Sequence, residues 1–100
     1  MNRQLTPHSP DEARQRLNNL PGWELLPDGK WISQRFTFTD FLSALDFVNK
    51  AGALAEEAGH HPDITLGWGY AVFTLQTHDA GGLTEKDFSL AEKINGVATS

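Results

Sequence analysis

The chain has 100 residues, of which 39% are hydrophobic and none is cysteine. A chain of about 100 residues is typical of one domain, so we expect residues 1–100 to fold as a single unit. Its 13 acidic and 8 basic side chains give a net charge of −5, which repels phosphate backbones and anionic lipids. We therefore expect neither nucleic acid nor membrane as a partner. The first residues lack an apolar segment, which predicts a cytoplasmic protein.

The first predicted helix covers residues 10–19. Ser9 is a favourable N-cap, Pro10 suits the first helical position, and Glu12 is placed to close a capping box. Pro21-Gly22 then ends the helix because neither residue favours its continuation.

Two strands are predicted next, over residues 23–26 and 30–38, joined by a turn at Pro27-Asp28-Gly29. Side chains alternate between the two faces of a strand. We expect one face of the second strand to be buried, namely that of Ile32, Gln34, Phe36 and Phe38. The opposite face carries Trp31, Ser33, Arg35 and Thr37.

The second predicted helix covers residues 41–58. Asp40 offers an N-cap, and Gly59 suits the left-handed residue that closes many helices. Apolar side chains recur at three- and four-residue steps, which is typical of a helix with one buried face. They are Phe41, Ala44, Leu45, Val48, Ala51, Ala55 and Ala58.

Two more strands are predicted over residues 64–68 and 71–77, with a turn at Gly69, and a last helix over residues 85–96. Thr84 would cap this helix, with Asp87 closing the capping box and Leu83 packing against Phe88. The resulting order is α-β-β-α-β-β-α. It predicts an α+β fold with one four-stranded antiparallel sheet and three helices on one face.

Three histidines, His60, His61 and His78, lie in predicted loops or at a strand end. Histidine exchanges protons near neutral pH, and functional side chains are often held in loops. A structural interpretation remains open for His60 and His61, because imidazolium is favourable near the C-terminus of a helix.

A zinc site formed with Asp63 and Asp79 is a weaker interpretation. His60 and His61 are adjacent, so their side chains point in different directions, whereas zinc motifs space their ligands so that they converge. A serine hydrolase is disfavoured because the sequence has no G-x-S-x-G turn. Gly81-Gly82 lacks the residues of a phosphate loop and more simply serves a turn that requires positive φ.

The histidines belong to a spaced pattern. Its members are Glu56, His60-His61-Pro62, Trp68, His78 and Asp87. This pattern resembles that of the pterin-4a-carbinolamine dehydratase family, in which a charged residue precedes His-His-Pro by four positions and an aromatic residue, a histidine and an aspartate follow. The resemblance extends upstream to Pro21-Gly22-Trp23 and residues 36–41 and covers nearly the whole chain.

The resemblance implies an activity. Members of this family dehydrate 4a-hydroxytetrahydropterins to quinonoid dihydropterins by acid/base chemistry that needs no metal or redox cofactor. It also implies that His60 and His78 are the acid/base pair and that His61 acts beside them and holds the pterin. The implied substrate-binding residues are Pro62, Asp63, Trp68, Thr77, Asp79 and Asp87.

Several of these roles have alternatives. Asp87 could serve only as the N3 residue of a capping box, and Trp68 could be a core or interface residue rather than a wall for a planar ligand. We also expect Asp63, Asp79 and Glu57 to favour the protonated form of the histidines.

The family resemblance also implies partners. It implies a homodimer or homotetramer and a functional link to an aromatic amino acid hydroxylase, while the C6 substituent of the pterin stays open. Relatives also act as dimerisation or assembly factors, so an interaction protein and a non-catalytic pterin binder are the competing hypotheses.

Overall fold

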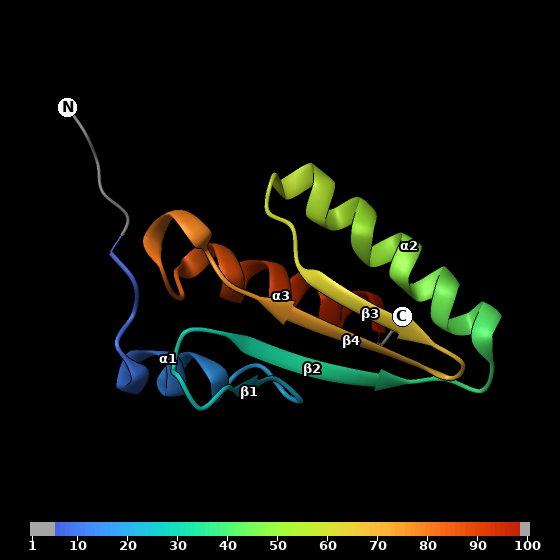
Figure 1. Cartoon of the computed structure of the whole chain (residues 1–100), viewed down its shortest axis with the longest axis horizontal. Coiled ribbons are helices and arrows are strands. Elements are labelled where there is room, and N and C mark those ends of the chain that lie inside the picture. The colour runs from blue at the N-terminus through green and yellow to red at the C-terminus, as the bar shows by residue number, and fades with distance from the viewer. Residues whose placement is uncertain (1–5, 99–100) are drawn as a thin grey trace.

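The computed structural model describes residues 6–98, which form three helices and four strands (Figure 1). The elements are α1 (Pro10–Leu17), β1 (Glu24–Leu25), β2 (Ile32–Thr37), α2 (Phe41–Ala58), β3 (Asp63–Gly67), β4 (Tyr70–Leu75), the 3₁₀ turn η1 (His78–Ala80) and α3 (Glu85–Ala98). No helix of this part of the chain is long and apolar enough to cross a bilayer.

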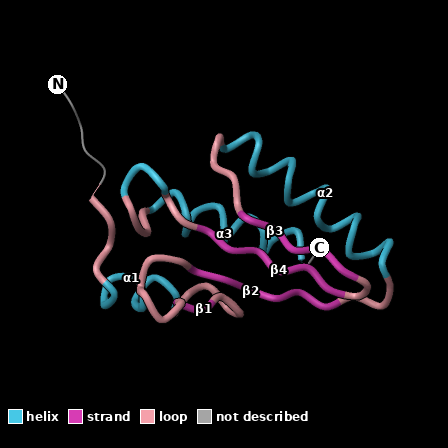
Figure 2. The backbone as a smooth tube through the Cα atoms, in the orientation of Figure 1, coloured by secondary structure: helices cyan, strands magenta, loops and turns pink. Residues whose placement is uncertain are grey.

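The four strands form one antiparallel sheet in the order β1-β2-β4-β3. Helices α2 and α3 run side by side along it (Figure 2), and the predicted α+β fold is confirmed. In β2, Ile32 lies opposite Leu75 of β4, and Asp63 of β3 lies opposite Thr74. The start of β3 and the end of β4 therefore lie at the same end of the sheet.

Local signals correctly predicted most of the helix ends. The Ser9 side chain accepts a hydrogen bond from the Glu12 backbone N–H at 3.1 Å, and the Ser9 N–H donates to the Glu12 carboxylate at 2.7 Å. Gly59 closes α2 with a φ of 65°, as predicted. Helix α1 ends two residues earlier than predicted, at Leu17, and α3 continues to Ala98.

Three of the four strands are shorter than predicted, whereas β3 has the predicted five residues but begins one residue earlier, at Asp63. β1 has two residues, Glu24 and Leu25, which pair with Ser33 and Ile32 of β2. β4 ends at Leu75 rather than residue 77, and the chain then enters η1. His78 thus begins a 3₁₀ turn beyond the strand.

The core lies between the helices and one face of the sheet. Ile32 and Phe36 of β2 are buried there, as predicted, with Phe73 of β4. The Phe47 ring of α2 packs on Phe36 and Phe73 at centroid distances of 4.7 and 5.6 Å. The predicted buried stripe of α2 was wrong at its ends, because its inward residues are Ala44, Phe47, Ala51 and Ala55, whereas Phe41 and Ala58 are exposed.

Candidate active site

Three histidines meet at the end of the sheet where β3 begins and β4 ends. His60 and His61 follow α2, and His78 follows β4. Together they line a cavity of about 230 Å³. The other residues that line it are Gly59, Gln76, Thr77, Asp79 and Lys86. The structure thus brings together five of the predicted site residues, His60, His61, Thr77, His78 and Asp79.

His60 is held by a buried carboxylate. Its Nε2 lies 2.5 Å from Oδ1 of Asp87, near the start of α3. The Asp87 side chain is fully buried, and 11% of the His60 side chain is exposed. Helix α3 therefore supplies a fixed anion behind the histidine.

The second oxygen of Asp87 holds the start of α3. Oδ2 accepts hydrogen bonds from the Thr84 backbone N–H at 2.9 Å and from the Thr77 hydroxyl at 2.8 Å. Since the Thr77 hydroxyl has one hydrogen, the Thr84 hydroxyl, 2.8 Å away, must donate to Thr77. The capping role of Asp87 is confirmed, and the same carboxylate also binds His60.

This arrangement fixes the tautomer of His60. A carboxylate only accepts hydrogen bonds, so the His60 Nε2 carries the proton that points to Asp87. In the neutral ring, Nδ1 then keeps a free lone pair. A buried carboxylate on one nitrogen of an imidazole also stabilises the imidazolium that forms when the other nitrogen takes a proton. This geometry would allow His60 to accept a proton at Nδ1.

The other two histidines are more exposed. His61 Nε2 lies 2.8 Å from a carboxylate oxygen of Glu56, and 63% of its side chain is exposed. His78 is also exposed. The carboxylates that contact histidines in the described chain are Asp87 and Glu56. The expected neighbours Asp63, Asp79 and Glu57 make no such contact.

Three other predicted site residues lie apart from the histidine cavity. Pro62 is half-buried beside His61, and Asp63, at the start of β3, lines a different cavity on the sheet. Trp68 is at the β3–β4 turn, at the opposite end of β3, and is 70% exposed.

The histidine cluster does not provide a set of metal ligands. Within residues 6–98, no three His, Asp or Glu side chains group closely enough to hold a metal ion. Asp63 and Asp79, the acidic residues considered for zinc, line separate cavities.

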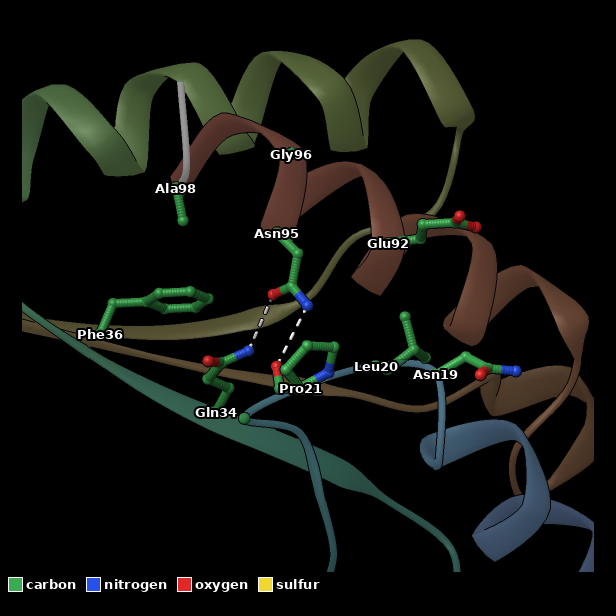
Figure 3. A pocket seen from close by; sticks show the side chains of 10 residues that line it. Asn19, Leu20, Pro21, Gln34, Phe36, Glu92, Asn95, Gly96 and Ala98 are labelled. Atoms are coloured by element: carbon green, nitrogen blue, oxygen red, sulfur yellow. Dashed lines mark hydrogen bonds between the residues drawn. The ribbon is translucent and has the colours of Figure 1, made fainter.

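A larger cavity, of about 540 Å³, lies between α3 and β2 (Figure 3). Asn95 spans one wall: its amide donates to the Pro21 carbonyl at 3.1 Å and accepts from the Gln34 amide at 3.0 Å. Glu92 is the one ionisable side chain among the described residues that line it. The three histidines are all in the smaller cavity.

Sequence comparisons assign the chain to a family. The sequence profile described as pterin 4 alpha carbinolamine dehydratase matches residues 6–97. A relative from Aromatoleum aromaticum is 48% identical over 94 residues, which cover 94% of this chain and 84% of that protein. One from Thermosynechococcus vestitus is 46% identical over 90 residues, which cover 90% and 93%. Both are provisionally named pterin-4-alpha-carbinolamine dehydratase.

Two solved structures are similar to this chain in fold. A crystal structure of a transcriptional coactivator/pterin dehydratase from Brucella melitensis is similar with a TM-score of 0.88 and 32% identity, over 93% of this chain and 99% of that one. A pterin dehydratase-like protein, described as a RuBisCO assembly factor in the alpha-carboxysome, is similar with a TM-score of 0.68 and 26% identity, over 79% and 92%. With a profile that matches most of its length, the chain belongs to the pterin-4-alpha-carbinolamine dehydratase family.

Proposed function

We propose that the protein is an enzyme that dehydrates 4a-hydroxytetrahydropterins to quinonoid dihydropterins. The observation that carries this proposal is the buried Asp87–His60 pair in a cavity shared with His61 and His78. Family membership supports the same reaction.

The reaction needs one acid and one base. The C4a–oxygen bond breaks as the hydroxyl is protonated and leaves as water, the neighbouring ring nitrogen loses its proton, and a C=N bond forms between them. In our proposal His60 is the base, because Asp87 keeps Nε2 protonated and leaves Nδ1 free. His78, which is exposed, donates the proton to the leaving hydroxyl and regains one from solvent.

The dimensions of the cavity suit a small substrate. Its volume of about 230 Å³ is below the range of about 300–1,000 Å³ that is usual for drug-sized ligands. A bicyclic pterin ring is smaller than such ligands, and His61 and Asp79 offer hydrogen-bonding groups at the edge of the cavity, where Thr77 holds Asp87 in place. Asp87 acts from behind His60, while Pro62 fixes the backbone that presents His61.

The remaining parts of the proposal follow the family. We propose that the reaction proceeds without a metal or redox cofactor, because two histidines meet its need for an acid and a base. A homo-oligomeric, cytoplasmic enzyme that is linked to an aromatic amino acid hydroxylase would fit this role.

The experiment is a direct rate measurement. A freshly generated 4a-hydroxytetrahydropterin is mixed with the purified protein, and its dehydration is followed by ultraviolet absorbance against the uncatalysed rate. We expect acceleration by the parent protein and a loss of about 10²-fold or more in His60→Ala and in His78→Ala, the usual scale for one acid/base group. Near-normal turnover in both variants would contradict the assigned roles.

A protein-interaction role is the second candidate. It is supported by the assembly-factor relative and by the exposure of Phe41 and Leu42 on α2, which are 45% and 63% exposed. Exposed apolar side chains that adjoin on one helix are typical of an interaction surface. A folded protein that leaves the dehydration rate unchanged would favour this candidate.

A further inference from the structure

The three histidines of the site differ in what holds their rings. His60 is bound to Asp87 and His61 to Glu56. Within residues 6–98, the His78 side chain has neither a hydrogen bond nor an ion pair with another side chain or with the backbone. Its ring instead contacts Trp31, at a centroid distance of 5.9 Å and an interplanar angle of 82°. An edge-to-face contact of this kind is a favourable geometry for two aromatic rings.

Trp31 can reach His78 because of the sheet register. Ile32 lies opposite Leu75, so Trp31 and Gln76 come next along the two strands, at the end of the sheet that carries the site. Trp31 and Thr74 line a cavity of about 510 Å³ that contains none of the histidines. Trp31 therefore borders that cavity and also contacts His78.

The backbone around Trp31 is held in place. The Trp31 carbonyl accepts a hydrogen bond from the Leu26 N–H at 2.9 Å, and the Gly29 N–H donates to the Leu26 carbonyl at 2.8 Å. The neighbouring Lys30 carbonyl accepts from the Gln76 amide at 3.2 Å, two residues before His78. These bonds hold the backbone at Trp31 next to the segment that carries His78.

We propose that Trp31 is a positioning residue for His78. This inference rests on the proposed dehydratase function, since the orientation of His78 matters only if His78 transfers a proton. Proton transfer requires the donor to lie within hydrogen-bond reach of the leaving oxygen. An exposed imidazole without a polar partner can rotate, and the Trp31 ring restricts that rotation.

The test compares two substitutions of Trp31. Trp31→Phe keeps an aromatic ring beside His78, whereas Trp31→Leu keeps apolar bulk and removes the ring. We expect Trp31→Leu to lower kcat about tenfold, which is less than the loss of about 10²-fold expected on removing His78, and to change KM less than about twofold. Trp31→Phe should restore most of kcat.

Leu26→Ala is the matched control. Leu26 lines the same cavity and lies in the same turn as Trp31, but its side chain has no ring to place against His78. We expect this variant to keep the parent kcat. A general loosening of the turn would instead lower activity in both Leu26→Ala and Trp31→Leu and would overturn the proposal.

A second measurement does not depend on activity. The imidazole resonances of His78 in nuclear magnetic resonance spectra should shift in Trp31→Leu, while those of His60, held by Asp87, should stay in place. Unchanged His78 resonances, an unchanged kcat in Trp31→Leu, or a loss confined to KM would each overturn the proposal. If the parent protein shows no dehydratase activity, the proposed function fails, whereas the resonance shifts still report whether Trp31 orients His78.

Discussion

Asp87 illustrates how one side chain couples the fold to the site. One carboxylate oxygen caps α3 through the Thr84 N–H, and the other accepts the Nε2 proton of His60. The capping signal is local in the sequence and predicted the first bond. The second bond joins two residues that are 27 positions apart in the sequence. Helix periodicity and turn signals describe neighbouring residues, so they do not predict this bond.

Asp87→Asn tests this double role. The amide oxygen can still accept from Thr84 and Thr77, which leaves the NH₂ group facing His60. Because that group donates, the His60 Nε2 must become the acceptor and Nδ1 must take the proton, so the base is lost. We expect kcat to fall about 10²-fold or more, as for loss of an acid/base group.

Steady-state rates, together with the nitrogen chemical shifts of His60, measure that outcome. Glu56→Gln is the control. It alters the exposed partner of His61, and because exposed ion pairs contribute little, we expect a change of less than about threefold. An unchanged kcat in Asp87→Asn would show that the His60 tautomer does not matter for the reaction.

At the scale of elements, the ends of α2 follow from single residues. Asp40 accepts a hydrogen bond from the Ser43 N–H at 2.8 Å, which holds the pKa of this carboxyl below its ordinary value of 3.8. A lowered pKa in the folded state stabilises the protein above that ordinary value. The stabilisation is lost as the pH falls through the lower folded value.

Asp40→Asn isolates this contribution. Asparagine is also a good N-cap, but it does not titrate, so the difference in unfolding free energy between parent and variant should shrink on acidification. Urea unfolding of both proteins at about pH 7 and about pH 2.5 measures the change. A difference that is the same at both pH values would mean that the cap bond does not depend on the charge of Asp40.

The segment between α1 and β1 depends on Gly22. Its φ of 87° is left-handed, and a Cβ there would lie 1.9 Å from Oε1 of Gln34, the residue whose Nε2 donates to Asn95. We expect Gly22→Ala to lower the unfolding free energy by about 1–3 kcal/mol, measured by urea unfolding.

Gly52→Ala is the matched control for Gly22→Ala. Gly52 lies within α2, and a Cβ there meets no atom within 4 Å. Alanine favours a helix over glycine, so this variant should be more stable than the parent by about 0.5–1 kcal/mol. Equal effects of the two substitutions would contradict the described geometry of Gly22.

The elements and their order were predictable because helix caps, turns and periodicity are local signals. The residues that fill the core and the contacts between distant segments were not predictable in this way. Periodicity alone gave Phe41 as a core residue, and only packing against the sheet shows that Phe47 takes that place. Strand alternation places Trp31 on the face opposite the core. A large aromatic side chain on that face was the one feature of the sequence that indicated a role outside the core. Its contact with His78 required the strand register.

At the scale of the whole molecule, the aromatic core packs α2 against the sheet that carries the site. Phe73 is fully buried in β4, five residues before His78, and its ring contacts Phe36 and Phe47. Phe73→Ala should lower the unfolding free energy by about 3–5 kcal/mol, a large share of the about 5–15 kcal/mol typical of a domain. Thermal and urea unfolding measure this loss.

Phe41→Ala makes the same chemical change at a residue that is 45% exposed, so we expect it to lower the unfolding free energy by less than about 1 kcal/mol. A loss at Phe41 as large as that at Phe73 would mean that Phe41 is buried in solution, for example by a second copy of the chain.

We propose that a pair of histidines at one end of the sheet catalyses dehydration of a pterin carbinolamine. The most direct measurement is the dehydration rate of a freshly generated 4a-hydroxytetrahydropterin with the parent protein and with the double variant His60→Ala/His78→Ala, with pterin binding measured in parallel. We expect acceleration by the parent, none by the folded double variant, and pterin binding by both. Pterin binding by a folded parent without acceleration would contradict it and would identify a pterin binder instead.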